Sequence, residues 1–135
     1  MNGTADDTGT IGIIVTHGRL AEELLRTAEL IIGTVKDCYA ISGSDLCDEE
    51  LVQRIRHIIV DSGRAHAVIF VDYFGGSCCI NSARAIDGIR GVKVVSGVNL
   101  PLLLDFLTKQ GKMGFEEMVR HLVSRGSESI KELDF

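Results

Sequence analysis

The sequence predicts an open α/β fold, in which a doubly wound, mostly parallel sheet carries helices on both faces. Short apolar runs alternate with longer amphipathic runs along the chain, which is the pattern of strands and helices in such a fold. Hydrophobic residues make up 45% of the 135 residues, whereas aromatic residues make up 5% and tryptophan is absent. A core built mainly from Ile, Val, Leu and Ala is typical of a buried parallel sheet.

The first half of the chain contains two predicted pairs of strand and helix. Residues 11–15 (IGIIV) form an apolar strand. Apolar positions at helical spacing follow from Leu20, and Gly33 is placed as a C-terminal cap. A second strand is predicted over residues 37–42, and the helix after it ends where Gly63 interrupts the pattern.

The second half contains two more pairs and a last helix. Residues 67–71 (AVIFV) are the most strand-like run, and a helix is predicted over 77–86. The fourth strand covers 92–98. Pro101 then opens a helix, at a position where its missing N–H does no harm. The last helix is predicted over about 115–123. The common order for four such strands is 2-1-3-4.

Length, charge and hydropathy limit the domain organisation and the classes of function. We expect a disordered tail over residues 1–9 and a single domain over 10–135. The formal net charge of -5 argues against a main role in binding nucleic acid or an anionic membrane surface. No apolar stretch is long enough to span a membrane, and the polar start lacks the features of a secretory signal. We therefore expect a cytoplasmic protein.

The cysteines form no recognisable pattern for a metal or a disulfide. They show no C-x-x-C motif and no paired histidine spacing, so we expect no metal site and no cofactor. A disulfide framework is implausible in so hydrophobic a chain, and free thiols are the simpler interpretation. The four residues are Cys38, Cys47, Cys78 and Cys79.

Two loops are predicted to meet at the crevice where the strand order reverses. In open α/β sheets, ligands bind at that point, beyond the carboxyl ends of the strands. For the order 2-1-3-4 the reversal lies between the first and third strands. The loops that meet there are residues 16–18 (THG) and residues 72–77 (DYFGGS).

These loops hold the parts of a phosphohistidine site. The carboxylate of Asp72 can accept a hydrogen bond from one ring nitrogen of His17, which leaves the other nitrogen free for attack or proton transfer. Backbone N–H groups at the helix starts after Gly18 and Gly76 favour a tetrahedral anion. Ser77 can add its hydroxyl. The pattern therefore predicts phosphorylation of His17.

Each of these residues also has a purely structural interpretation. Ser77 suits an N-cap, and Gly75 with Gly76 suits a tight turn. Asp72 can be a solvated loop acid, and His17 a chance polar residue. Only their coincidence at one predicted crevice favours a site. Structural or merely exposed roles are assigned to the other histidines, which are His57, His66 and His121.

Three motifs, each weak alone, form a specific combination. They are THG after the first strand, DxxGGS after the third and GVNLP after the fourth. The segments that carry them are IGIIVTHGRLAEELLRTAELIIG at 11–33, VIFVDYFGGSCCINSARAI at 68–86 and VVSGVNLPLLLDFL at 94–107. Together they resemble the enzyme IIA component of mannose-type sugar phosphotransferase systems, over nearly the whole chain after the tail.

The resemblance implies a phosphocarrier supplied ultimately by phosphoenolpyruvate. His17 would accept a phosphoryl group from the phosphohistidine of the small carrier HPr and pass it to a IIB component, with membrane sugar permease subunits as indirect partners. Asp72 would orient the ring and Ser77 would contact the phosphate. The predicted phosphate-binding residues are Thr16, Gly18, Gly76 and Ser77.

The resemblance also implies the order 2-1-3-4 and a homodimer, in which an additional edge strand near the C-terminus is exchanged between subunits. Here that strand would fall around residues 127–133 (SESIKEL). One departure is Cys78, which stands where the family commonly has proline. A looser turn is expected, with the serine and the N–H groups retained. Together with Cys79 it also raises the hypothesis of an oxidation-sensitive site.

Other functions of the same architecture stay open. A regulatory module would use the same phosphorylation as a signal that a partner reads, without sugar uptake. A receiver-like or ligand-binding domain fits less well, because Thr16 and His17 stand where a receiver would carry acidic residues. A phosphotransferase subunit for dihydroxyacetone kinase is the nearest related family, but the GGS and NLP segments favour the mannose type. The sequence does not identify a sugar.

Overall fold

Four parallel strands form the central sheet of the computed structural model, which describes residues 9–134. They lie in the order β2-β1-β3-β4, so the predicted order 2-1-3-4 is confirmed. The central strands β1 and β3 are buried along their whole length, whereas the edge strands β2 and β4 carry partly exposed residues. The bounds are β1 Ile11–Thr16, β2 Cys38–Ser42, β3 Ala67–Val71 and β4 Val92–Ser96.

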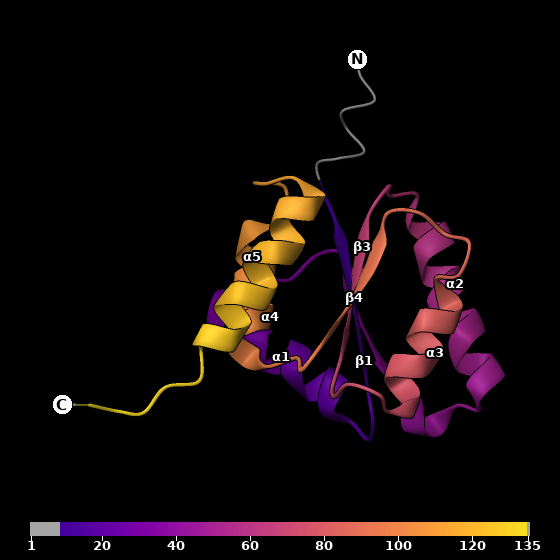
Figure 1. Ribbon diagram of the computed structural model, residues 1–135, viewed down its shortest axis with the longest axis horizontal. Coiled ribbons are helices and arrows are strands. Elements are labelled where there is room, and N and C mark those ends of the chain that lie inside the picture. The colour runs from indigo at the N-terminus through magenta and orange to yellow at the C-terminus, as the bar shows by residue number, and fades with distance from the viewer. Residues whose placement is uncertain (1–8, 135) are drawn as a thin grey trace, which may run out of the picture.

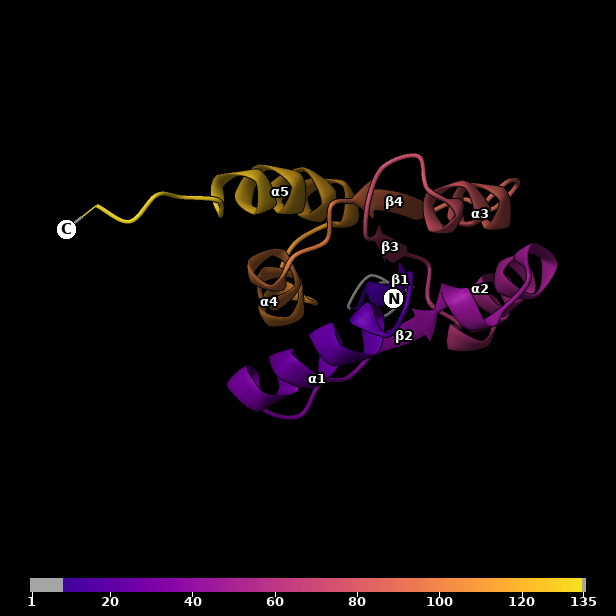
Figure 2. The same cartoon turned by 90° about the horizontal axis from the view of Figure 1, so that it is seen from below.

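Helices cover both faces of this sheet. As Figure 1 and Figure 2 show, α1, α4 and α5 lie on one face, and α2 and α3 lie on the other. A short 3-10 helix, η2 (Gly43–Asp45), follows β2. The α-helices are α1 Leu20–Ile32, α2 Asp48–Ser62, α3 Ser77–Ala85, α4 Leu100–Lys109 and α5 Phe115–Glu128.

Alternating side chains of the central strands contribute to two apolar cores, one on each face of the sheet. Ile13 belongs to the core under α2 and α3, and Ile14 belongs to the core under α1, α4 and α5. In the second core, Phe70 meets Phe106 edge to face, with ring centroids 5.1 Å apart. Gly12 makes room for that contact, since a Cβ there would approach the Phe106 ring at 2.6 Å. Both cores hold the central strands, and therefore their carboxyl ends, in place.

The register of the sheet brings the ends of β1 and β3 together. Val15 of β1 pairs with Val71 of β3, so the residues that follow them leave the sheet at the same edge. His17 and Asp72 therefore meet, although 55 positions separate them in the sequence. This edge, at the bottom of Figure 1, is where the strand order predicts a ligand site.

Local signals set several helix boundaries as predicted. Gly33 ends α1 with a φ of 91°, and Gly63 ends α2 with a φ of 67°, a region that favours glycine. Asn99 caps α4, because its side chain accepts the backbone N–H of Leu102 at 2.9 Å. Pro101 lies in the first turn of that helix. These four residues confirm the predicted ends of α1 and α2 and the start of α4.

The last helix is longer than predicted. α5 continues to Glu128, beyond the expected end at residue 123, and passes through Gly126. Gly126 is buried against α4, where a Cβ would approach Leu102 at 2.7 Å. A glycine that would weaken an isolated helix is thus used here for close packing between two helices.

The edge strand predicted at 127–133 is not present in the described chain. Its first two residues belong to α5, and residues 130–134 have no secondary structure and extend away from the domain in Figure 1 and Figure 2. Exchange of this segment between subunits stays a prediction. The predicted tail, residues 1–9, lies outside the described residues except for Gly9, whose carbonyl accepts a hydrogen bond from Arg64 at 3.0 Å.

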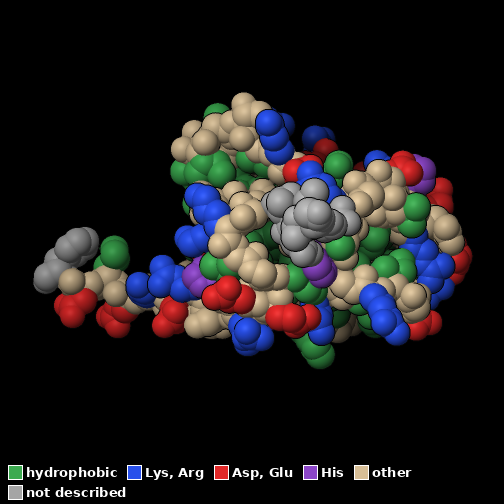
Figure 3. Space-filling view, turned by 90° about the horizontal axis from the view of Figure 1, so that it is seen from above, with side chains coloured by type: hydrophobic (Ala, Val, Ile, Leu, Met, Phe, Trp, Pro, Cys, Tyr) green, Lys and Arg blue, Asp and Glu red, His purple; other side chains and the backbone are tan. Residues whose placement is uncertain are grey.

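The end of the domain opposite the crevice carries charges of both signs. In Figure 3, Lys and Arg side chains alternate with Asp and Glu side chains on that face. A mixed surface of this kind lacks the basic stripe that marks a nucleic-acid footprint. Within residues 9–134, no helix combines the length and the apolar character needed to cross a membrane.

Candidate functional site

His17 lies on the short turn that connects β1 to α1. β1 ends at Thr16 and α1 begins at Leu20, so residues 17–19 alone make the connection. Gly18 has a φ of 57°, in the left-handed region that side chains other than glycine rarely adopt. The tight turn leaves the imidazole 41% exposed at the carboxyl edge of the sheet.

Asp72 contacts both the backbone N–H and the ring of His17. Oδ2 of the carboxylate accepts the backbone N–H of His17 at 2.8 Å and lies 2.8 Å from the ring atom Nδ1. Oδ1 accepts the backbone N–H of Tyr73 at 3.0 Å. Both oxygens are therefore engaged, and together they fix the orientation of the imidazole.

The ionisation of Asp72 decides where the ring proton lies. Burial by itself raises the pKa of Asp72, but the hydrogen bonds from His17 and Tyr73 outweigh it and lower the pKa below its ordinary value. An ionised carboxylate can only accept hydrogen bonds, so Nδ1 carries the proton and Nε2 carries the lone pair. Nε2 is therefore the nucleophilic atom of the neutral ring.

Ser77 and the start of α3 face this nitrogen. Ser77 Oγ lies 3.1 Å from Nε2. The N-cap of α3 is Gly76, so the interpretation of Ser77 as the N-cap is wrong, and its hydroxyl contacts the ring instead. The backbone bonds of α3 begin with the Ile80 N–H and the Gly76 carbonyl. The preceding N–H groups have no partner within the helix, and they suit an anion beside Nε2.

Tyr73 packs against the histidine. The two rings are stacked, with centroids 5.3 Å apart and planes 24° apart. Gly76 allows this arrangement, because a Cβ there would approach the Tyr73 ring at 2.5 Å. The sequence pattern marked Gly76 as part of a turn and gave no signal for the stacking, which depends on how the loop after β3 folds back.

Thr16 is not placed to contact a phosphate. Its side chain is fully buried, and its Oγ1 accepts the backbone N–H of Ala21 in the first turn of α1 at 2.7 Å. These contacts do not support a phosphate-binding role for the Thr16 side chain, and the role predicted for this residue stays a prediction. The threonine instead satisfies an otherwise unpaired N–H of α1 and so fixes the turn that carries His17.

Replacing Thr16 by valine is expected to lower the free energy of unfolding by about 1–3 kcal/mol, because the change leaves the N–H of Ala21 buried without an acceptor. Urea unfolding followed by circular dichroism measures the effect. Thr108→Val is the matched control, since the exposed Thr108 hydroxyl bonds only to carbonyls of its own helix. Equal losses in the two variants would contradict the role assigned to Thr16.

Two serines without a recognisable sequence motif contact the His17 turn through Gly18. Ser44 Oγ accepts the backbone N–H of Gly18 at 2.7 Å, and Ser42 Oγ donates to the Gly18 carbonyl at 2.6 Å. The N–H predicted to bind phosphate at Gly18 is thus already paired, and the Ser44 hydroxyl is the group beside it. The predicted strand order indicates both serines. Because β2 borders β1, Ser42 at the end of β2 and Ser44 just after it lie at the same edge of the sheet as His17.

Cys78 lies next to the pair formed by His17 and Asp72. Its Sγ is 3.7 Å from Nδ1 of His17, and the residue is 1% exposed. Burial, assisted by the charge of Asp72, raises the pKa of the Cys78 thiol to about 11. Oxidation requires an accessible thiolate, so the structure does not favour the hypothesis of oxidation sensitivity at this residue. All four cysteines are free thiols, as predicted.

The other histidines lie outside this site. His57 contacts Asp61 at 2.8 Å on the exposed surface of α2, and His121 of α5 contacts Asp105 of α4. His66 stacks on an aromatic ring of α5. Their assignment to structural or exposed positions agrees with these contacts.

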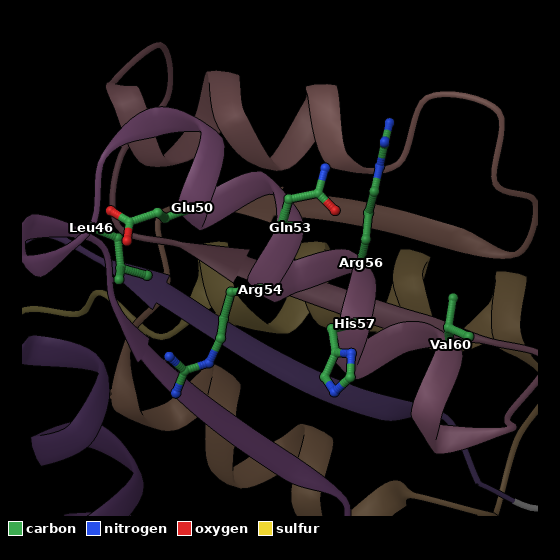
Figure 4. Close-up of a pocket in the computed structure, with 7 residues that line it drawn as sticks. All are labelled: Leu46, Glu50, Gln53, Arg54, Arg56, His57 and Val60. Carbon is green, nitrogen blue, oxygen red and sulfur yellow. The ribbon is translucent and has the colours of Figure 1, made fainter.

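The polar side chains that line a depression along α2 do not point toward one another. In Figure 4 the side chains that line it point in different directions. Glu50 accepts the backbone N–H of Cys47, and Arg56 donates to carbonyls of Arg84 and Ala85. The depression is lined by Leu46, Glu50, Gln53, Arg54, Arg56, His57 and Val60. The candidate site is therefore the group of hydrogen-bonded residues around His17.

The fold and the site together define an open α/β domain in which a histidine, oriented by a carboxylate, faces the start of a helix. Comparison with known families agrees with this class. The family model EIIA-man, described as "PTS system fructose IIA component", matches residues 12–123. The chain belongs to this family, which confirms the resemblance seen in its motifs.

Two related proteins match most of the length of this chain. The "PTS system mannose-specific EIIAB component" of Escherichia coli K12 is 32% identical over 130 residues, which cover 92% of this chain and 40% of that protein. The chain thus spans about two fifths of the length of that relative. The "PTS system sorbose-specific EIIA component" of Lacticaseibacillus casei is 29% identical over 115 residues, covering 82% of this chain and 81% of that protein.

Solved structures share the fold. An EIIA component from Streptococcus agalactiae superposes with a TM-score of 0.84 at 20% identity, covering 91% of this chain and 96% of that chain. A mannose/sorbose-specific IIA subunit from Enterococcus faecalis gives a TM-score of 0.82 at 22% identity, covering 94% and 96%. The predicted fold class is therefore confirmed.

Proposed function

We propose that this chain is a phosphocarrier of a phosphoenolpyruvate-dependent sugar phosphotransferase system. It accepts a phosphoryl group on His17 from phospho-HPr and passes it to a IIB component during sugar uptake. One observation carries the proposal: Asp72 holds Nδ1 of the ring while Nε2 faces Ser77 at the start of α3. The names of the relatives, which refer to mannose and sorbose systems, support uptake over a purely regulatory role.

The charges around the ring suit the transfer. The lone pair of Nε2 attacks the phosphorus of the donor phosphohistidine, and the donor N–P bond breaks with its electron pair returning to the donor ring. The phosphorylated ring of His17 keeps its proton on Nδ1 and carries positive charge, which the carboxylate of Asp72 offsets. The Ser77 hydroxyl and the N–H groups of the first turn of α3 bind the phosphoryl oxygens. In the second transfer a nucleophile of the IIB component attacks the phosphorus, and the N–P bond of His17 breaks with its electron pair returning to Nε2.

Exposed apolar side chains beside the crevice support the docking of a partner protein. Leu20, Tyr73 and Phe74 are 46%, 55% and 85% exposed; Leu20 begins α1 just after the His17 turn, and the other two lie on the loop after β3. Single exposed apolar residues are common, but a group of them around a reactive side chain suits an interaction surface. We assign this surface to HPr and to the IIB component.

The proposal includes a homodimer. Ile130 and Leu133 are 85% and 79% exposed on the segment that follows α5, and β4 lies at an edge of the sheet. Pairing of this segment with the β4 edge of a second subunit would cover both features. The proposal also places the protein in the cytoplasm, with the membrane sugar permease as an indirect partner.

Incubation of the purified protein with phosphoenolpyruvate, enzyme I and HPr tests the proposed function. We expect the intact mass to rise by one phosphoryl group, and we expect mild acid to remove that group, as it does for an N–P bond. Omission of HPr is the control and should abolish the gain. No gain in mass with the complete mixture would refute the phosphocarrier role.

A further inference from the structure

Cys78 adds a second kind of ligand chemistry to the crevice. The donor atoms of His17, Asp72 and Cys78 lie within 4.8 Å of one another. In the part of the chain that the structure describes, no other group of histidine, cysteine and acidic residues brings three such atoms together. Imidazole nitrogen, carboxylate oxygen and thiolate sulfur are the three ligand types that proteins use for zinc.

We propose that a soft divalent cation, Zn²⁺ in particular, binds to His17, Asp72 and Cys78 and reversibly blocks phosphorylation of His17. The inhibition of phosphorylation rests on the proposed function, whereas the binding of the metal does not. The transfer reaction uses no metal in this scheme, so the cation acts on the carrier as an inhibitor.

The two distances from Nδ1 of His17 can be compared with those of a tetrahedral zinc site. Ordinary Zn–N, Zn–O and Zn–S bonds place a nitrogen ligand about 3.5 Å from a sulfur ligand and about 3.3 Å from an oxygen ligand. In the structure Nδ1 of His17 lies 3.7 Å from Sγ of Cys78 and 2.8 Å from Oδ2 of Asp72. The nitrogen and the oxygen therefore have to separate by about 0.5 Å, and the carboxylate also has to leave the line of its hydrogen bond to Nδ1 so that the cation can take that position.

The backbone around the site supports these positions. Asp72 keeps its hydrogen bonds from the N–H groups of His17 and Tyr73, which do not involve the ring. Gly43 packs closely against Sγ of Cys78, since a Cβ there would approach it at 2.7 Å. Cys78 is 1% exposed, so a cation can reach Sγ only past the imidazole, which is 41% exposed, and water can complete the coordination on that side.

Binding at Nδ1 removes the nucleophile. The cation takes the place of the proton on Nδ1, and that proton moves to Nε2, because a neutral imidazole with a metal on one nitrogen carries its hydrogen on the other. Nε2 then has no lone pair with which to attack phosphorus. The thiol proton of Cys78 passes to solvent as the Zn–S bond forms, and dissociation of the cation reverses both changes.

The thiol also sets which cations bind. Mg²⁺ and Ca²⁺ prefer sites built from several oxygen ligands, and this site offers oxygen from one side chain. Zn²⁺ and Co²⁺ accept the mixed set. We therefore expect inhibition by zinc and none by magnesium at the same concentration.

A titration of the full chain with Co²⁺ tests the site without any phosphoryl transfer. Cobalt bound to a thiolate gives a charge-transfer band in the near ultraviolet, and competition with Zn²⁺ gives the zinc affinity. We expect the band in the wild-type chain and in the matched control Cys79→Ser. We expect Cys78→Ser to lose the band and to bind zinc at least about 10- to 100-fold more weakly. Equal zinc affinity and an unchanged band in a folded Cys78→Ser protein would overturn the site.

Phosphorylation from preformed phospho-HPr, with and without zinc, tests the inhibition. The measured quantity is the ratio of the two rates for each protein, so differences in basal rate between variants cancel. We expect zinc to slow the wild-type chain and Cys79→Ser by at least about tenfold, and to change the rate of Cys78→Ser much less. Zinc binding without slower phosphorylation would overturn the inhibition. If the wild-type chain accepts no phosphoryl group at all, the proposed function fails, and the cobalt titration still decides the metal site.

Discussion

Replacement of His17 by alanine is expected to abolish phosphorylation from phospho-HPr while the fold is retained. His17 supplies the nitrogen that faces Ser77 at 3.1 Å, and without it no N–P bond can form at the crevice. Its side chain is 41% exposed, so truncation opens no cavity in either core. Intact mass after incubation with the complete phosphoryl-transfer mixture measures the loss, and circular dichroism checks the fold.

His57→Ala is the matched control for this experiment. His57 contacts Asp61 at 2.8 Å, which reproduces the pairing of an imidazole with a carboxylate, but on the exposed surface of α2. We expect this variant to be phosphorylated like the wild-type chain. Phosphorylation of His17→Ala to the same extent would show that another residue is the acceptor and that the site is wrongly assigned.

Replacement of Asp72 by asparagine is expected to slow phosphorylation of His17 by about 10²- to 10⁴-fold. Both carboxylate oxygens accept hydrogen bonds, one from the backbone and ring of His17 and the other from Tyr73. An amide offers one acceptor oxygen and one donor NH₂ group, so in either orientation a donor faces a donor. The neutral amide also no longer offsets the positive charge of the phosphorylated ring.

A tautomer measurement separates this positioning role from a general loss of structure. The pKa of Asp72 is lower in the folded chain than its ordinary value, so its favourable contribution is present above the unfolded pKa and is lost as pH falls through the folded pKa. Near neutral pH the carboxylate therefore holds the proton on Nδ1. Nitrogen-15 NMR of the ring should show that tautomer in the wild-type chain and in the control Asp61→Asn.

The same spectrum of Asp72→Asn should show a changed distribution of the proton between Nδ1 and Nε2. The expected result is slower phosphorylation together with this change. An unchanged rate, or a slower rate with the wild-type tautomer, would contradict the role of Asp72 in orienting the ring and placing its proton.

Local sequence patterns were sufficient to predict most of the strands and helices of the fold. Apolar runs identified the strands, and residues such as Gly33 and Asn99 marked helix ends through their own backbone preferences. The pairing of His17 with Asp72 was also predictable, because strand order places the carboxyl ends of β1 and β3 at one edge. Each of these features depends on short segments or on a general rule of parallel sheets.

Other features depended on contacts between segments far apart in the sequence. The last helix was predicted to end at about residue 123, and the packing of Gly126 against Leu102 helps to explain why α5 continues to Glu128. Thr16 was predicted to contact the phosphate, but its side chain accepts a hydrogen bond from Ala21 in the first turn of α1. Ser44 carried no signal of its own until β2 was placed beside β1.

The sequence by itself thus determined the order of the elements, the class of fold and the histidine and aspartate of the site. The tertiary structure alone decided which donors are already paired, which nitrogen of His17 is free and that Cys78 lies beside that ring. The physical reason is that hydrophobic periodicity acts over one or two turns of chain, whereas the direction of a side chain and its hydrogen-bond partner are set by the elements packed around it.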